Sequence, residues 1–249
     1  MNMRRYPSVT ALSAAAQTGV VREIFTTVQD RYDFLNHFLS FRRDIGWRRA
    51  TVTAMRFGRT NRMLDVATGT ADLALETASA HPGVHVTGVD FAAPMLAIGA
   101  RKVRAAGLAD RVELREGDAL ALPFADALFD VTAVAFGMRN IPDRRRALRE
   151  MARVTVPGGQ VMVLEMSFAP AGPFRPLYGV YLSHVLPRVA RLFARNPATY
   201  WYLGDSIRRF PVPRAFSALM EEAGLEDVTA HRLTFGAACL HIGRRPEGT

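Results

Sequence analysis

The residues best suited to chemistry in this sequence lie in and after a turn near position 69. Gly69 stands in the stretch 65–72 (DVATGTAD), where a residue without a Cβ lets a ligand approach the backbone closely. Asp65 begins this stretch, within a short apolar run. Asp90 ends a second apolar run, about 20 residues after the turn, where an acid can accept hydrogen bonds from both hydroxyls of a ribose. Capping of the following helix is the alternative role for Asp90.

Asp118 closes a third apolar run and completes the series. Its carboxylate could accept a hydrogen bond from an adenine amino group while the Ala119 amide donates to the ring, although an ordinary turn aspartate would look the same. Glycine occurs in the turn only at position 69, so the G-x-G-x-x-G pattern of dinucleotide-binding proteins is absent and a pyrophosphate has less room. A glycine turn followed by acids for ribose and adenine suits S-adenosylmethionine as the ligand.

Alternating strands and helices must position these residues. Short apolar runs bounded by turns predict strands at 62–67, 84–89, 112–116, 128–136 and 160–166. Helical spacing predicts helices at 71–79, 93–105, 144–154 and 214–223, with Pro157-Gly158-Gly159 stopping the third. Two final strands, 227–234 and 237–242, should form an antiparallel hairpin around Gly236. This α/β pattern predicts a doubly wound, mostly parallel sheet whose ligands bind at the carboxyl ends of the strands.

Two helical additions interrupt this pattern. We expect a flexible N-terminus at 1–20 and a single domain at 21–249, which includes a helical cap at 21–57 and a helical insert at 170–209. In the insert, 178–193 is predicted to form one basic amphipathic helix with a candidate kink at Pro187. Its apolar stripe consists of Leu182, Val185, Leu186, Val189 and Phe193, and its charges are Arg188, Arg191 and Arg195. Such a helix could face a membrane, or pack against the cap or a second subunit.

Four motifs follow one another along the chain. The cap carries 32–36 (YDFLN), then Ser40 and Trp47, and the fourth strand ends in 136–140 (FGMRN). A third motif runs from 153–159 (RVTVPGG) to 164–167 (LEMS). The tail contributes Tyr202-Leu203, Ser206-Ile207-Arg208, and Phe235-Gly236 before Leu240-His241. Together these motifs resemble the ubiquinone/menaquinone biosynthesis C-methyltransferases, the demethylmenaquinone methyltransferase family, over roughly residues 22–244.

This resemblance implies a class I methyltransferase with a Rossmann-like sheet that depends on S-adenosylmethionine. It implies methylation at a ring carbon of a demethylmenaquinol, a polyprenyl benzoquinol, or both. A small-molecule O- or N-methyltransferase on the same fold is the alternative function. Because the substrate would be a polyprenyl hydroquinone, we expect a cytoplasmic enzyme with a peripheral contact at the inner face of the membrane. A homodimer is a further candidate assembly.

The resemblance also implies roles for particular residues. It places cofactor contacts at Thr70, Asp90, Asp118 and Ala119, beside those expected of Asp65 and Gly69. It implies that Arg139 and Asn140 orient a water and stabilise a phenolate, with Tyr32 in the cap as the third catalytic candidate. A loop arginine paired with Asp143 is the alternative for Arg139. Arginine stays protonated in proteins, so we do not expect Arg139 to act as a base.

The sequence departs from the family pattern at four positions. Ala71 stands where the family has glycine, Ala135 where it has serine, Asp44 where it has histidine, and Val156 where it has lysine. We expect Ala135 to remove one cofactor contact. Asp44 changes the side chain that the cap offers for contact with the substrate.

Composition and charge separate the remaining function classes. The 249 residues are 49% hydrophobic and carry a formal net charge of +9, which favours anionic partners such as nucleic acid, an anionic membrane surface or acidic metabolites. Cys239, the only cysteine, cannot form an internal disulfide, which fits a reducing cytoplasm. Its predicted place in the final strand argues against a cysteine nucleophile, and no aromatic N-P-P-Y-type clamp follows the fourth strand. We therefore expect no nucleic-acid substrate.

The sequence also predicts no metal site and no membrane span. His81 and His85 have i,i+4 spacing, but Pro82-Gly83 lies between them and prevents a helical pair. No cluster of carboxylates has metal-ligand spacing, which argues against a magnesium-dependent catechol O-methyltransferase. No run approaches the roughly 18 apolar residues that a spanning helix needs.

Overall fold

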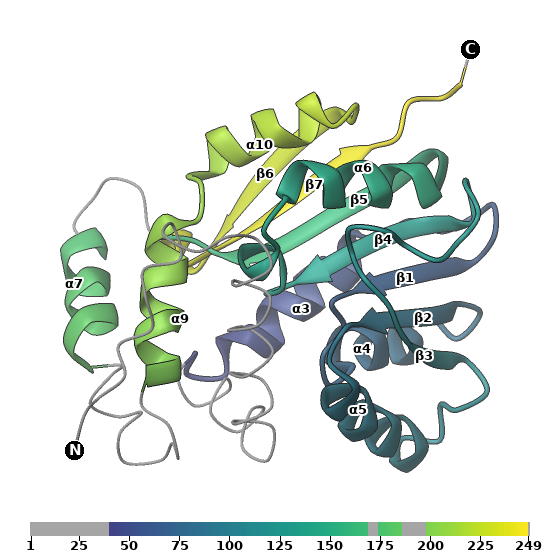
Figure 1. Ribbon diagram of the computed structural model, residues 1–249, viewed down its shortest axis with the longest axis horizontal. Helices are drawn as coiled ribbons and strands as arrows, with labels where there is room; N and C mark the ends of the chain where they lie inside the picture. The colour runs from purple at the N-terminus through teal and green to yellow at the C-terminus, as the bar shows by residue number, and fades with distance from the viewer. Residues whose placement is uncertain (1–39, 169–173, 186–197, 249) are drawn as a thin grey trace.

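The computed structural model describes residues 40–168, 174–185 and 198–248, whose strands form one seven-stranded sheet (Figure 1). The strands are Arg62–Val66 (β1), His85–Asp90 (β2), Val112–Glu116 (β3), Phe129–Ala135 (β4), Thr155–Met166 (β5), Glu226–Leu233 (β6) and Ala238–Arg244 (β7). Their order is β3-β2-β1-β4-β5-β7-β6. The first five strands are parallel, whereas β7 is antiparallel to both β5 and β6. The order reverses between β1 and β4, which is where such sheets bind ligands.

Helices cover both faces of the sheet, so inner strands such as β1, β2 and β4 are largely buried, whereas the edge strands β3 and β6 are largely exposed. One face carries α3 (Arg43–Ala54), α4 (Asp72–Ala80) and α5 (Ala93–Ala105), and the other carries α6 (Arg144–Val154) and α10 (Pro213–Glu222) (Figure 1). Successive strand residues point to opposite faces. Met63 therefore belongs to the core that contains Trp47, while Leu64 belongs to the core that contains Phe216.

Two helical pieces of the insert lie beyond the carboxyl ends of the parallel strands (Figure 1). The first is α7 (Phe174–Val180), which continues into a π-helical turn, η4 (Tyr181–Val185), and the second is α9 (Ala198–Arg209). Arg208 of α9 joins the two pieces, because its Nη2 donates to the carbonyl of Gly179 at 3.0 Å. α9 also packs against η3 (Met138–Asn140), the short 3₁₀ helix after β4. The insert therefore covers the edge of the sheet where a ligand is expected.

The sequence pattern predicts most of these elements. The predicted bounds 93–105, 112–116 and 144–154 are those of α5, β3 and α6, and the other predicted sheet elements, apart from the fifth strand, agree within two residues. The last hairpin is confirmed, with η5 (Thr234–Gly236) as its turn. Cys239 is buried in β7, as expected.

The prediction for the fifth strand was wrong at its start. β5 begins at Thr155, so Pro157-Gly158-Gly159 lies inside the strand instead of stopping the preceding helix. Thr155 pairs with Phe129 and Gln160 with Val131, and the residues between them form a bulge. A glycine is required there, since Gly158 has a φ of +73° and a Cβ at Gly159 would lie 2.7 Å from the carbonyl oxygen of Asp130.

The prediction for the insert was also wrong in part. Its first helix begins at Phe174, four residues before the predicted start, and α9 was not predicted as a helix. Leu182, assigned to a membrane-facing stripe, is buried in the same core as Ile207, as the packing alternative expects. Other members of that stripe and its arginines lie outside the described residues: Leu186, Arg188, Val189, Arg191, Phe193 and Arg195. The predicted cap before residue 40, which contains Tyr32, also lies outside them.

Candidate functional site

A cavity of about 440 Å³ lies at the carboxyl ends of β1 to β4. It contains all six residues predicted to bind the cofactor, together with one of the three catalytic candidates: Asp65, Gly69, Thr70, Asp90, Asp118, Ala119 and Asn140. The loops after four neighbouring strands thus meet in one place, as the strand order requires. The cavity runs from Asp118 after β3, past Asp90 at the end of β2, to Thr70 after β1.

The turn after β1 has an unusual backbone. Ala67, Gly69 and Ala71 all have positive φ, at 53°, 56° and 68°. Only glycine adopts this conformation without steric cost, so Ala71 carries strain at the position where a glycine was expected from the resemblance. Thr68 stabilises the turn, because its amide donates to the carbonyl of Val89 at 3.0 Å and its hydroxyl donates to Asp65 Oδ2 at 2.6 Å.

Asp65 is fully buried beneath this turn. Burial raises its pKa to about 7, although the hydrogen bond from the Thr68 hydroxyl opposes the shift. The nearby carboxylates of Asp90 and Asp72 raise it further. A carboxyl group that is half protonated near neutral pH, in a cavity with other acids, would be stabilised in its ionised form by a cationic ligand.

Asp90 connects two turns with one carboxylate. Its Oδ2 accepts from the amide of Gly69 at 2.8 Å, and its Oδ1 accepts from the amide of Ala92 at 2.9 Å, just before α5. The capping role is therefore present, but it does not exclude ribose binding, since each carboxylate oxygen can accept a second hydrogen bond. Burial raises the pKa of Asp90, while the backbone amides lower it.

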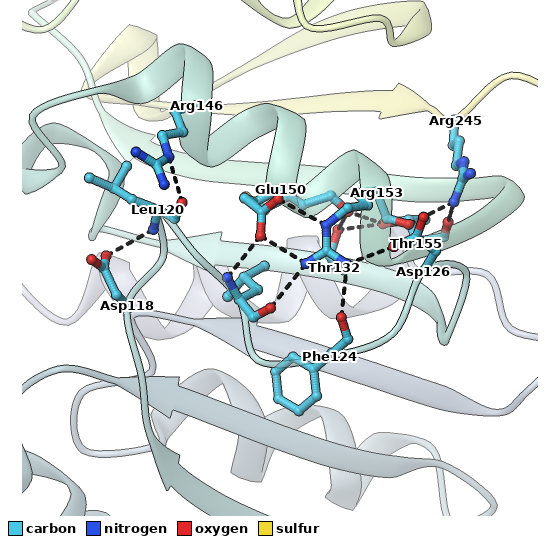
Figure 2. A network of polar contacts seen from close by, with 12 residues as sticks. Asp118, Leu120, Phe124, Asp126, Thr132, Arg146, Glu150, Arg153, Thr155 and Arg245 are labelled. Atoms are coloured by element: carbon cyan, nitrogen blue, oxygen red, sulfur yellow. Dashed lines mark hydrogen bonds and ion pairs between the residues drawn. The ribbon is translucent and has the colours of Figure 1, made fainter.

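The loop that carries Asp118 and Ala119 is held by α6 (Figure 2). Asp118 Oδ1 accepts from the amide of Leu120 at 2.8 Å, and Arg146 Nε donates to the carbonyl of Leu120 at 2.7 Å. Arg153 donates to the carbonyls of Leu122 and Phe124 at 3.0 and 2.8 Å and pairs with Glu150 and Asp126. These bonds fix the part of the loop that would face an adenine.

At the β1 end of the cavity, charged side chains connect the cap to the cofactor turn. Arg48 of α3 pairs through Nη2 with Asp44 Oδ2 at 2.7 Å and with Asp72 Oδ2 at 3.2 Å. Lys102 of α5 also pairs with Asp72 and donates to the Thr70 hydroxyl at 3.2 Å. Arg48, Thr70 and Asp72 line the cavity.

Arg139 does not line this cavity, although its neighbours Gly137 and Asn140 do. Its Nη1 donates to Glu165 Oε1 at 2.5 Å and to the carbonyl of Phe136 at 2.6 Å, and its amide donates to Glu165 Oε2 at 3.0 Å. Both charged side chains are buried. The alternative pairing with Asp143 is wrong, because Asp143 instead caps α6 by accepting from the amide of Arg146.

A row of aromatic rings extends from this ion pair to the surface. Phe168 stacks on Tyr178 with centroids 6.1 Å apart, Tyr178 stacks on Tyr181 at 6.3 Å, and Tyr181 contacts Phe41 at 5.9 Å. Burial raises the pKa of Tyr178, and the charge of Arg139 lowers it, so the phenol lies within electrostatic reach of the guanidinium. We call Phe168, Tyr178, Tyr181 and Phe41 the aromatic row.

Comparison with known proteins identifies the family. The model of the ubiE/COQ5 methyltransferase family matches residues 12–245. The chain belongs to this family. It is 47% identical over 223 residues to a demethylmenaquinone methyltransferase of Thermus thermophilus, which covers 90% of this chain and 100% of that protein. It is 42% identical over 226 residues to a ubiquinone/menaquinone biosynthesis C-methyltransferase of Geotalea daltonii, covering 90% of this chain and 96% of the relative.

Solved structures support the fold. An S-adenosylmethionine-dependent methyltransferase of Thermotoga maritima, described as a possible histamine N-methyltransferase, aligns with a TM-score of 0.63 at 17% identity and covers 90% of this chain and 98% of its own. An O-methyltransferase family protein of Burkholderia thailandensis aligns with a TM-score of 0.62 at 17% identity and covers 91% of this chain and 63% of its own. The class I methyltransferase fold is therefore confirmed, and S-adenosylmethionine is the cofactor of this ubiE/COQ5 enzyme.

The cavity fits that cofactor chemically. Five carboxylates line it, from Asp65, Asp72, Asp90, Glu116 and Asp118. S-adenosylmethionine carries positive charge at its sulfonium and ammonium groups, so an acidic cavity complements it. The assignment of single residues to single cofactor groups stays a prediction.

Sequence reasoning missed three residues that support this ubiE/COQ5 site. Arg153 and Glu165 lie in the third motif, but their partners come from distant parts of the chain, which a motif does not name. Arg48 directly follows the motif residue Trp47 and was not singled out. Its signal was a basic residue four positions after Asp44, a spacing that allows an ion pair on one helix face.

Proposed function

We propose that this member of the ubiE/COQ5 family methylates a ring carbon of a polyprenyl hydroquinone, with demethylmenaquinol as the first candidate. The names of the Thermus and Geotalea relatives support this substrate class. The structural observation that carries the proposal is the buried Arg139–Glu165 pair, which follows the cavity residue Gly137 in the loop after β4 and lies within electrostatic reach of Tyr178 in the aromatic row. Stacked rings suit an aromatic substrate, and a buried guanidinium suits its phenolate.

In this proposal the bound cofactor supplies an electrophilic methyl group. Loss of a phenolic proton from the hydroquinone places negative charge on the adjacent ring carbon, which makes that carbon nucleophilic. The carbon would take the methyl group, S-adenosylhomocysteine would leave, and loss of the hydrogen of that carbon as a proton would restore the aromatic ring. Arg139 stabilises the phenolate, since a fixed donor in a site that excludes water is worth more than a donor in solvent. Its two bonds from Nη1 hold the guanidinium in one orientation, so Glu165 acts as its positioning residue.

Asn140 and Tyr32 complete the proposed catalytic group. Asn140 lines the cavity next to Phe136 and Gly137, where the methyl group is expected, and can orient a water that carries away the phenolic proton. A Cβ at Gly137 would lie 2.7 Å from that of Ala67, so only glycine lets the loops after β1 and β4 approach this closely. The role of Tyr32 rests on the motif alone.

Product analysis tests this function. The purified protein is incubated with methyl-labelled S-adenosylmethionine and either reduced demethylmenaquinol or the oxidised quinone. We expect label on a ring carbon with the reduced ring only, because the quinone has no phenolic proton to lose. Label on oxygen or nitrogen would support the small-molecule alternative instead, and mass spectrometry with carbon NMR separates these outcomes.

We further propose a peripheral contact with the cytoplasmic face of the membrane, where such a substrate resides. None of the helices that the structure describes is long and apolar enough to cross a bilayer. Phe41 and Phe235, however, are 75% and 82% exposed and are held with positive φ, at 52° and 55°. Phe41 is the outer end of the aromatic row and is followed by Arg42 and Arg43. Exposed aromatic rings beside basic residues favour an anionic lipid surface.

A further inference from the structure

Arg48 occupies a distinctive place in the cofactor cavity. Among the described residues that line the cavity it is the only cation, beside five carboxylates. Its side chain is 11% exposed and projects from α3, outside the sheet. Burying an arginine costs desolvation free energy, which ion pairs or hydrogen bonds with its partners must offset.

The donors of Arg48 are only partly used. Its ion pairs with Asp44 and Asp72 both involve Nη2. Within the described part of the chain, Nη1 and Nε make no hydrogen bond, and neither atom is sealed from solvent. A guanidinium offers five donors in a planar fork that matches a carboxylate. The geometry therefore leaves donors on Nε and on Nη1, at two different edges of the guanidinium, for an acceptor that enters the cavity.

The order of residues along the cavity indicates which group of the cofactor would be this acceptor. With the adenine at Asp118 and the ribose at Asp90, as in the proposed function, the remaining part of S-adenosylmethionine must extend toward Thr70, Asp72 and Arg48. That part is an amino acid, with an ammonium and a carboxylate. The acids of the cavity suit the ammonium, whereas the carboxylate needs a cation.

We propose that Arg48 binds the α-carboxylate of S-adenosylmethionine, and that Asp44 and Asp72 hold its guanidinium in position. This inference rests on the proposed placement of the cofactor in the cavity. It makes helix α3 part of the cofactor site, so that recognition of the amino-acid end depends on the packing of α3 against α4. It also gives Asp44, which departs from the family pattern, a use: it orients Arg48 and is itself bonded by Ser40 at 2.6 Å.

The test compares two ligands that differ only in the carboxylate. Calorimetry measures the affinity of the full-length protein for S-adenosylmethionine and for decarboxylated S-adenosylmethionine, without an acceptor. The wild type should bind the decarboxylated ligand roughly 10- to 150-fold more weakly, the range for charge-assisted hydrogen bonds. Arg48→Met should weaken binding of S-adenosylmethionine by a similar factor and leave the decarboxylated ligand almost unaffected.

Two further variants keep the result interpretable. Arg48→Lys retains the charge but not the fork, so it should recover part of the discrimination and serves if Arg48→Met unfolds. Arg49→Met is the matched control, because Arg49 is the next residue on α3, is 68% exposed and pairs only with Glu76 among the described residues. It should leave both affinities unchanged.

Equal weakening of both ligands in Arg48→Met and Arg48→Lys would overturn the proposal and make Arg48 a structural link between α3 and α4. A wild type that binds both ligands equally would also overturn it. Because the assay contains no quinol, neither result bears on which ring the enzyme methylates. Failure of ring methylation in the product assay would likewise leave the Arg48 result standing.

Discussion

Residues of the loop after β4 line the cofactor cavity, and Arg139 of the same loop lies within electrostatic reach of the aromatic row, yet the electrostatics of the two regions differ. In the cavity, burial raises the pKa values of Asp65 and Asp90, and five carboxylates face a single arginine. Beside the aromatic row, the buried charge of Arg139 already has Glu165 as its counter-ion. The negative charge of the cavity is thus larger than Arg48 can neutralise, so a cationic ligand is needed to balance it. The charge of Arg139 is therefore balanced before a ligand binds, whereas Arg175 and Arg208 add positive charge at the Phe168 ring, 5.3 and 5.2 Å from its centroid.

The largest expected effect comes from replacing Arg139, which lies within electrostatic reach of the aromatic row. Arg139→Ala should lower turnover by roughly 10²–10³-fold, the scale of losing one preorganised donor. Affinity for S-adenosylmethionine should change little, since Arg139 does not line the cavity. Arg139→Lys should recover only part of the turnover because it lacks the fork. Steady-state kinetics with reduced demethylmenaquinol and calorimetry with the cofactor measure the two quantities.

A double variant separates chemistry from stability in this experiment. Arg139→Ala leaves Glu165 as an uncompensated buried charge, which should cost about 3–5 kcal/mol of unfolding free energy. Arg139→Met/Glu165→Gln removes both charges and keeps an acceptor for one of the two backbone amides, at positions 139 and 166, that donate to different oxygens of Glu165. It should regain part of the stability but not the turnover. Recovery of turnover would mean that Arg139 only supports the fold.

The next effect comes from the cavity. Asp90→Ala should weaken S-adenosylmethionine binding by about 10- to 150-fold, because it removes charge-assisted hydrogen bonds to the ribose. It also frees the amides of Gly69 and Ala92, so the turns themselves loosen. The matched control is Asp110→Ala, an exposed aspartate before β3 at the opposite edge of the sheet. An unchanged affinity in folded Asp90→Ala, measured by calorimetry, would remove the ribose assignment.

These two regions also differ in how far the sequence predicts them. The cavity could be predicted because Asp65, Gly69, Asp90 and Asp118 each lie at or just after the carboxyl end of a strand, and parallel strands end at one edge of the sheet. Strand ends are local features, so periodicity and turn residues locate them.

The aromatic side could not be predicted in the same way. The partner of Arg139 is 26 residues away near the carboxyl end of β5, and periodicity gives no sign of that pairing. Glu165 looks instead like one polar position in an apolar strand. The insert was harder still, because its helices pack on one another and on η3, so no single sheet face sets their pattern.

A pH titration sharpens the comparison further. The pKa of Asp65 is raised to about 7 from an ordinary value of 3.8, so the folded protein binds this proton more tightly than the unfolded chain. The contribution of Asp65 to the stability of the ligand-free protein is therefore largest below pH 4, and is lost as the pH rises toward 7. A cationic ligand favours the ionised form, so cofactor affinity should rise with pH, by up to about tenfold per unit, and level off above pH 7.

Asp65→Asn identifies the group responsible for that slope. The amide keeps an acceptor for the Thr68 hydroxyl but does not titrate. Thermal melts without ligand and calorimetry with S-adenosylmethionine, both between pH 5.5 and 8.5, should lose most of their pH dependence in this variant. If the slope persists, another group carries it, and Asp90, whose pKa burial also raises, is the next candidate.

The smallest expected effect concerns the outer end of the aromatic row. Phe41→Ser should weaken binding to anionic vesicles by about 3- to 12-fold. This fold-change corresponds to losing half of the free energy of burying a phenylalanine side chain. Arg42→Ala should weaken it by about fivefold, since one basic residue near an anionic surface is worth about 1 kcal/mol. Vesicle sedimentation at low salt measures both.

The control for this contact is a basic residue at the other edge of the sheet. Arg59→Ala removes the same charge as Arg42→Ala, but Arg59 lies in the loop before β1, where it pairs with Glu247. If the contact is local to the aromatic row, Arg59→Ala leaves vesicle binding unchanged, because a charge more than a Debye length from the lipid surface is screened. If Arg42→Ala and Arg59→Ala weaken binding equally while Phe41→Ser does not, the attraction is one of net charge. In that case the exposed phenylalanines have another role.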